Sequence, residues 1–268
     1  MPLKMTVTTM ILGSILLSKA VSGHASIEAS LRHVLVQEVK QWKIHDMDRP
    51  QPIVVDPGTC GSAPSDAIRL FDGGNLDHWI GRYGNTPDWT IKDGYFQVRP
   101  GGGDIRTSST YGDCQLHMEW MIPEDRGCDG QSGCNSGVFF QDRYEVQILH
   151  SNGNRTYPDG MAASLYGQSP PLVNACRPKG QWNTYDIIYR APRFNQDGTL
   201  KSPARMTVIF NGIPVQIDVA LVGDTSHMRR VGYTAHPDKG PIRLQDHGDP
   251  ICFRNIWVRN LPPQQVVE

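Results

Sequence analysis

The sequence contains no run of lysine or arginine residues, and its 26 basic and 27 acidic residues leave a formal net charge of -1. Proteins that bind nucleic acid or anionic membranes through electrostatics carry a basic patch or stripe. We therefore expect no nucleic-acid partner. The balanced charge favours a small, uncharged ligand.

Common catalytic and metal-binding motifs are also missing. The chain has no G-x-S-x-G elbow, no H-E-x-x-H pair, no P-loop and no glycine-rich dinucleotide fingerprint after a strand. The sequence therefore gives no support for an α/β-hydrolase, a zinc protease or a nucleotide-dependent enzyme. The cysteines include no C-x-x-C pair and fit no structural zinc spacing.

The six cysteines, at positions 60, 114, 128, 134, 176 and 252, are compatible with an oxidising compartment. Sequence alone leaves many pairings open. Cys128 and Cys134 are the strongest disulfide candidates, because they flank a glycine-rich loop and a bridge between them would close a small ring. Such a bridge would stiffen the segment that leads into Asn135.

The N-terminus has the order of a targeting segment. Lys4 precedes a mostly apolar run from Met5 to Leu17, and the small residues Ser22, Gly23 and Ala25 follow. This order predicts a signal peptide over residues 1–25, and the run is too short for a comfortable membrane span; a buried N-terminal helix is the alternative. We expect a periplasmic or secreted bacterial protein with no membrane span after cleavage, and an N-terminal extension or linker over residues 26–65.

From residue 66 the chain consists of short runs rich in β-branched and aromatic residues, separated by turn residues and without a long helical period. This pattern predicts an all-β sandwich over residues 66–262. Hairpin turns are expected at Asp93-Gly94 and Asn211-Gly212, with Pro214 marking an edge strand or a bulge. Further strands are expected at Cys114–Met121, Gly137–Phe140, Tyr144–Leu149, Trp182–Tyr189, Ile242–Gln245 and Cys252–Val258.

Polar side chains alternate with apolar ones along two of these strands. In the strand 144–149, Glu145 and Gln147 share the face opposite the core and lie roughly 7 Å apart, a spacing suited to one sugar ring. Glu119 occupies the corresponding face of the strand 114–121. We expect the two polar stripes to floor one groove, although the same alternation is typical of a sheet with one solvent-facing side.

His247 and Arg254 are two further candidates. His247 lies between Asp246 and Gly248 at the end of a strand, where an imidazole could act as an acid or a base near neutral pH. Isolated histidines are more often surface groups, so the position alone is weak evidence. Arg254 lies in an apolar strand and needs a buried partner, either a groove carboxylate such as Glu145 or backbone carbonyls.

The chain carries a series of short motifs in a fixed order, which include Leu70–Gly73, Asn135–Phe139, Tyr144–Leu149, Leu165–Gly167, Leu244–Gly248 and Phe253–Trp257. Taken together, these motifs resemble the bacterial family of 3-keto-disaccharide hydrolases over roughly residues 66–262. The resemblance implies a jelly-roll β-sandwich of the concanavalin A-like lectin/glucanase type, and cleavage of a sugar oxidised at C3. A C3 ketone acidifies the C2 proton, so one base and donors for the enolate suffice for elimination, with hydration afterwards.

The resemblance also suggests roles for individual residues. The catalytic candidates are His247, Glu145 and Gln147. The substrate-binding candidates are Asn135, Glu119, Asp104, Tyr166, Trp182, Gln245 and Arg254. A divalent metal ion, held by His247 and Glu145, is the one cofactor considered. His150 and the cysteine-bearing loop from Gly127 to Cys134 depart from the family's usual pattern, which bears on substrate choice and metal dependence.

Two other functions stay open at this point. A non-catalytic carbohydrate-binding module would use the same groove of aromatic and amide side chains for binding alone. A conventional glucanase of this fold needs two acids in the frame E-x-D-x-x-E, which here reads Glu145-x-Gln147-x-x-His150. The paired-carboxylate mechanism is therefore disfavoured, unless Glu119 supplies the second acid.

Overall fold

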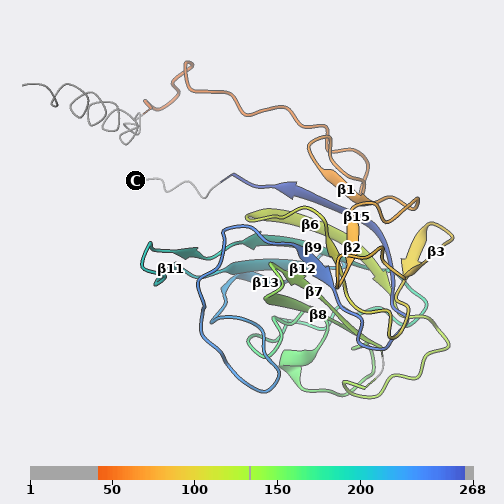
Figure 1. The fold of residues 1–268 in the computed structure, drawn as a ribbon. Helices are drawn as coiled ribbons and strands as arrows, with labels where there is room; N and C mark the ends of the chain where they lie inside the picture. Colours follow the sequence, from red (N-terminus) through yellow and green to blue (C-terminus); the bar gives the residue numbers. More distant parts are fainter. Residues whose placement is uncertain (1–41, 133, 263–268) are drawn as a thin grey trace, which may run out of the picture. The chain divides into compact units, whose positions relative to one another are not determined.

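The computed structural model describes residues 42–132 and 134–262 (Figure 1). The chain divides into two units, residues 1–53 and residues 54–268. Residues 43–49 of the first unit form turns, in which the backbone N–H of Asp46 donates to Lys43 O and that of Arg49 donates to Asp46 O. The predicted signal peptide, residues 1–25, lies outside the described residues. Within the described part of the chain, no helix is long and apolar enough to cross a membrane.

The second unit is built from antiparallel strands in two main sheets and one small ribbon. The eight-stranded sheet runs β13-β12-β9-β6-β15-β4-β3, with β1 also paired to β15. Its strands are β1 (Ile68–Phe71), β3 (Thr90–Lys92), β4 (Tyr95–Gln97), β6 (Cys114–Met121), β9 (Asn183–Arg190), β12 (Arg205–Phe210), β13 (Ile213–Ala220) and β15 (Cys252–Asn260).

The five-stranded sheet runs β2-β5-β14-β7-β8. Its strands are β2 (Trp79–Gly81), β5 (Ile105–Thr107), β7 (Asn135–Phe140), β8 (Tyr144–Leu149) and β14 (Ile242–Leu244). β10 (Arg193–Phe194) and β11 (Leu200–Ser202) form the ribbon, and a single 3₁₀ turn at Pro158–Gly160 is the only helix among the described residues. The two main sheets pack around one core, which confirms the predicted all-β, jelly-roll sandwich (Figure 1).

The two predicted hairpins are confirmed, and their turns have the expected backbone. Asp93 and Gly94 have φ angles of 49° and 79° between β3 and β4, and Asn211 and Gly212 have 50° and 81° between β12 and β13. Two successive positive φ angles match a type I′ turn, which suits the twist of paired strands. Pro214 lies in β13, an edge strand of the larger sheet, where a missing backbone N–H costs least.

The core follows the alternation expected of the strands. Leu116, Met118 and Trp120 of β6 are fully buried, as are Tyr144 and the other inward residues of β8. Burial of an apolar side chain of this size contributes about 1.5–3 kcal/mol, so these inward positions fix which face of each strand meets the core. The opposite face of β8 is thereby left to Glu145 and Gln147.

The edge of β8 is covered by irregular chain. The backbone N–H of Gln147 donates to Ser164 O at 3.0 Å, and that of Ala163 donates to Gln147 O at 2.9 Å. From another segment, Thr225 accepts the backbone N–H of Glu145 at 3.0 Å through its Oγ1. These bonds protect an edge strand that would otherwise be open to pairing. They also enclose the polar face of β8, so that Glu145 and Gln147 are buried and not solvent-facing.

Candidate active site

A cleft of about 270 Å³ lies over the non-core face of the five-stranded sheet. Six of the residues expected from the sequence line it together: Asn135, Glu145, Gln147, Tyr166, Gln245 and His247. Phe139, Thr225, Ser226 and His227 complete the lining. The acid, the amides and the imidazole proposed for one groove therefore share one cavity, although their chemical roles stay predictions.

Glu145 lies at the base of the cleft and is only 6% exposed. Its cross-strand partner on β7 is Phe139, and the carboxyl group occupies the space beside Gly137. A Cβ atom on Gly137 would overlap Glu145 Oε1 and would lie 2.9 Å from Phe139 Cε2. Glycine at position 137 is therefore what makes room for the buried acid.

Burial of the carboxyl group raises the pKa of Glu145 to about 8. The positive charge of Arg243 opposes this shift and the negative charge of Asp104 reinforces it. Arg243 is shared between two other carboxylates, since its Nη1 lies 2.5 Å from Asp104 Oδ2 and its Nε lies 3.0 Å from Asp142 Oδ1. Glu145 is consequently a neutral acid at pH 7, able to donate a hydrogen bond or a proton.

The amide groups of the cleft form a connected set. Gln147 Nε2 donates to Gln131 Oε1 at 3.2 Å; in the opposite amide orientation its nitrogen donates to Ser136 O at 2.8 Å and to Glu145 Oε1 at 3.2 Å. Asn135 Nδ2 donates to Gln131 O at 3.1 Å. Gln131 was missed by the sequence analysis, because it lies in the irregular loop between Cys128 and Cys134 and no spacing marks it.

His247 is exposed at the cleft on a turn that is fixed by the residue before it. The carboxylate of Asp246 accepts the backbone N–H groups of Gly103 and Gly248, each at 2.9 Å. Asp246 therefore holds the turn and does not orient the imidazole. The His247 ring makes no hydrogen bond to any residue that the structure describes, which leaves both of its nitrogens available to a ligand.

A chain of hydroxyl and imidazole groups forms another wall. The hydroxyl groups of Tyr157 and Tyr166 lie 2.9 Å apart, and Tyr166 Oη lies 3.1 Å from His227 Nδ1. Burial, followed by the hydrogen bond with Tyr157, raises the pKa of Tyr166. Sequence reasoning found Tyr166 and missed His227, because His227 belongs to a segment without strand alternation or a recognisable motif.

Three predicted substrate-binding residues lie elsewhere. Glu119, Trp182 and Arg254 belong to the eight-stranded sheet or to its flank, where Arg254 Nε donates to Glu119 Oε2 at 2.7 Å. The Arg254 guanidinium lies 4.1 Å from the centroid of the Trp182 ring. The expectation that β6 and β8 floor one groove is wrong, because the two strands belong to different sheets and their polar faces point away from a shared core. Arg254 accordingly pairs with Glu119 and not with Glu145.

Asp104 and His150 also lie outside the lining of the cleft. Asp104 Oδ1 accepts the backbone N–H of Asp246 at 2.9 Å, and the rest of its carboxylate binds Arg243. It therefore supports the His247 turn from an adjoining pocket. His150 is 8% exposed beside the disulfide loop, and burial, followed by the charge of Lys179, lowers its pKa. The third position of the glucanase frame thus does not face the cleft.

The side chains around the cleft give little support for metal binding. Glu145 and His247 line the same cleft, but the described residues contain no group of three or more His, Cys, Asp or Glu side chains placed to hold a metal ion. Most protein sites for zinc use three or four such ligands. We therefore derive no chemical step through a metal.

The geometry of the cleft can be compared with known proteins. Residues 66–259 match the model of the 3-keto-alpha-glucoside-1,2-lyase-like domain family. The chain belongs to this family. A relative named 3-keto-disaccharide hydrolase, from Bacteroides thetaiotaomicron, is 25% identical over 90% of this chain and 91% of its own length.

Solved structures from Parabacteroides distasonis that are provisionally named glycosyl hydrolases also resemble this member of the 3-keto-alpha-glucoside-1,2-lyase-like family. One is 43% identical with a TM-score of 0.77, covering 84% of this chain and 97% of the other. A second is 25% identical with a TM-score of 0.52, covering 73% of this chain and 99% of the other. The family model thus establishes the family, and these structures agree with the fold.

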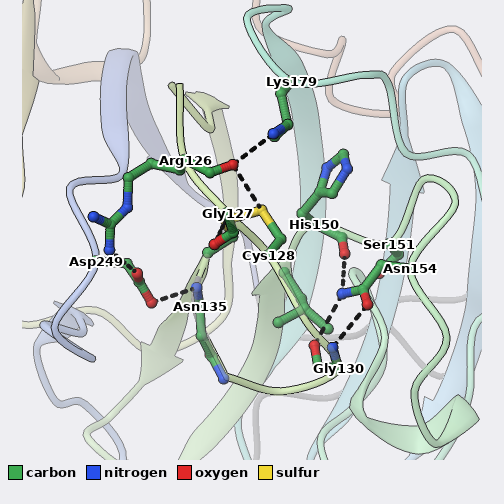
Figure 2. The surroundings of a disulfide bond; sticks show 12 residues. Arg126, Gly127, Cys128, Gly130, Asn135, His150, Ser151, Asn154, Lys179 and Asp249 are labelled. Atoms are coloured by element: carbon green, nitrogen blue, oxygen red, sulfur yellow. Dashed lines mark hydrogen bonds and ion pairs between the residues drawn. A yellow bond between two sulfur atoms is a disulfide. The ribbon is translucent and has the colours of Figure 1, made fainter. Parts of the chain in front are cut away.

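The predicted disulfide between Cys128 and Cys134 is present, with the two Cα atoms 5.5 Å apart. Figure 2 shows how the surrounding loop is tied to the rest of this lyase-like domain. Asn154 Oδ1 accepts the backbone N–H of Gly130 at 2.8 Å, while Asn154 Nδ2 donates to Gly130 O at 2.9 Å. The loop that carries Gln131 is therefore fixed both by a covalent bridge and by reciprocal hydrogen bonds.

Asp249 joins this loop to the strand and to the histidine turn. It is 4% exposed; its Oδ1 accepts from Arg126 Nη2 at 2.9 Å and its Oδ2 accepts the backbone N–H of Asn135 at 3.1 Å (Figure 2). Since Asp249 follows His247 by two residues, one buried carboxylate connects the His247 turn to β7 and to Arg126, which precedes the disulfide loop. Charge-assisted bonds of this kind are among the stronger ones in proteins.

We expect Gly137→Ala to displace the Glu145 carboxyl group, because the new methyl group would overlap Oε1. Overpacking at such a site costs about 1–3 kcal/mol of folding free energy. Urea denaturation should register that loss, and turnover should fall further than the stability change accounts for. Gly74→Ala is the control, since its Cβ would meet nothing nearer than Asp72 Oδ1 at 3.5 Å. Wild-type turnover in Gly137→Ala would contradict the assignment.

We expect the paired change Cys128→Ser/Cys134→Ser to lower the free energy of unfolding by about 1–3 kcal/mol, since the ring is small. kcat/KM should fall severalfold, because Gln131 and Asn135 lose their anchor. The exposed free cysteine Cys60 supplies the control variant, Cys60→Ser. The role given to the loop is wrong if the double variant loses stability and retains full kcat/KM.

Proposed function

We propose that this chain cleaves the glycosidic bond of 3-keto-α-glucosides, including 3-keto-disaccharides, by removal of the C2 proton and elimination at C1, followed by addition of water. The observation that carries the proposal is the pairing of a neutral carboxylic acid with an accessible imidazole in one cleft. The route requires a base that can take the carbon-bound proton, and an acid that can protonate the leaving oxygen assists the second bond cleavage.

In the first step, a ring nitrogen of His247 takes the proton from C2, and the electrons of the C2–H bond form an enolate with the C3 carbonyl. Hydrogen bonds from Gln147 and Asn135 stabilise the negative charge on the C3 oxygen. The enolate then collapses to a C1=C2 double bond as the C1–O bond breaks. Glu145 gives its proton to the departing oxygen.

Water completes the reaction in the second step. Its oxygen adds to C1 while C2 takes back the proton held by His247, which restores the base. The net change is hydrolysis, and no oxidant or reductant is consumed. Glu145, now ionised, accepts a proton from the water and returns to its neutral state. The buried site favours this return, because desolvation disfavours the charged carboxylate.

A conventional double displacement fits the cleft less well. A retaining glycosidase needs two carboxyl groups about 5–5.5 Å apart. Glu145 is the only acid among the described residues that line this cleft, and Glu119 belongs to the other sheet. The family match and the names of its relatives support the 3-keto substrate independently of the geometry.

We also propose that the protein acts outside the bacterial cytoplasm on a small carbohydrate. The order of basic, apolar and small residues over positions 1–25 supports export. The Cys128–Cys134 bridge is in keeping with an oxidising compartment.

His247→Ala should lower kcat/KM on 3-keto-trehalose by about 10²–10⁴-fold, the usual contribution of a general base.

The kcat/KM of the wild-type protein should decline as pH rises through about 8, because Glu145 donates only while protonated. Glu145→Gln should have low activity and lack this alkaline decline. Release of free sugar, followed with and without EDTA, measures the activity of the wild-type protein and of both variants.

The exposed residue His78, which does not line the cleft, provides the control variant His78→Ala. Full activity in His247→Ala would reject the base assignment. Saturable binding of the sugar with no product from the wild-type protein would instead identify a carbohydrate-binding module. Loss of activity in EDTA, restored by a divalent cation, would show that the base acts with a metal.

A further inference from the structure

We propose that a second pocket beside the cleft binds the leaving group of the substrate, and that it selects leaving groups that carry a carboxylate on a ring. This inference rests on the proposed function and extends it to substrate choice. The pocket has a volume of about 410 Å³, and Tyr157, Tyr166, His227, Met228, Arg229 and Arg230 contribute to its lining.

The second pocket adjoins the cleft. Tyr166, Ser226 and His227 line both cavities. A glycoside whose C2 lies near His247 must extend its C1 substituent beyond a cleft of about 270 Å³. The second pocket, on the side of the three shared residues, can receive that substituent. Two adjoining cavities of these sizes suit two linked rings, with the sugar in one and the leaving group in the other.

Arg229 and Arg230 differ in one respect from several other arginines of the domain. Arg243, Arg143 and Arg126 each have a carboxylate within 4.0 Å. Arg229 and Arg230 are exposed and make no ion pair with any residue that the structure describes. They are the cations at this end of the site whose charge is not already matched by a carboxylate of the domain.

The carboxyl groups nearby do not cancel these two charges. Glu145 is neutral at pH 7 because burial raises its pKa to about 8, and Asp159 is the single acid among the pocket-lining residues. Two guanidinium groups against one carboxylate leave an excess of positive charge. Arginine is well suited to binding carboxylates through paired N–H donors.

Ring surfaces in the pocket suit a flat leaving group. Tyr157 and Tyr166 form an edge-to-face pair, with centroids 6.4 Å apart at 67°. Met228 is 88% exposed, so an unbranched thioether stands in the open at the pocket wall. Aromatic and thioether groups pack favourably against a ring, while the arginines meet its charged substituent.

The test compares two 3-keto-α-glucosides with matched leaving groups, 4-hydroxybenzoate and the uncharged 4-hydroxybenzamide. The wild-type protein should prefer the carboxylate in kcat/KM, and added salt should weaken the preference. Arg229→Gln/Arg230→Gln should lower kcat/KM for the carboxylate about five- to twentyfold and leave the amide within about twofold. Arg69→Gln, an exposed arginine of β1, is the control.

The outcomes separate the two proposals. Equal use of both substrates by the wild-type protein, or a preference that survives in the double variant, overturns the pocket assignment and leaves the cleavage reaction standing. Cleavage of neither substrate overturns the proposed function. In that case calorimetric binding of free 4-hydroxybenzoate, lost in the double variant, still supports an anion-binding pocket, and its absence overturns that as well.

Discussion

The proposed chemistry depends on the removal of one carboxyl group, that of Glu145, from water. Glu145 lies on the non-core face of β8, an edge strand of the smaller sheet, where an acid would ordinarily be solvated and ionised. Backbone bonds from the segment around Ser164 and a hydroxyl group from Thr225 cover that edge, and Gly137 leaves space for the carboxyl group. The resulting desolvation keeps a proton on Glu145 at neutral pH, and the proposed chemistry uses that proton.

The strands of the sandwich hold Glu145 and the amide groups in place, and an irregular segment brings His247 beside them. β7 and β8 present Asn135, Glu145 and Gln147 in fixed register. His247 lies on a turn held by Asp246, and Asp249 connects that turn to β7 and to the disulfide loop. His247 and Glu145, the proposed base and acid, are therefore held by different elements that are joined through the hydrogen bonds of Asp249. Such cross-linking preserves their spacing without requiring either residue to be part of the core.

Local rules predicted most of the fold. Alternation located β6 and β8 at their observed bounds, and Asn211-Gly212 identified its hairpin, because both signals are contained within a few residues. The site was predicted in part. Glu145, Gln147 and His247 do share a cleft, but Glu119 and Arg254 do not belong to it. A strand's alternation shows which residues share a face, and it does not show which sheet the strand joins.

The parts that sequence reasoning missed depend on long-range contacts. Gln131 binds Gln147 from an irregular loop, His227 lines the cleft from another, and the burial of Glu145 comes from segments distant in the sequence. Balanced overall charge likewise favoured an uncharged ligand, although charge can be concentrated locally, as it is at Arg229 and Arg230.

The most direct test of the account is the protonation state of Glu145 itself. Difference infrared spectroscopy of the wild-type protein against Glu145→Gln, at pH 7, reports the carbonyl stretch of a protonated carboxylic acid. The account predicts that this band is present in the wild-type protein, is absent from the variant, and is replaced by a carboxylate band as the pH is raised through about 8. A carboxylate band at pH 7, with no protonated acid lost on substitution, would contradict it.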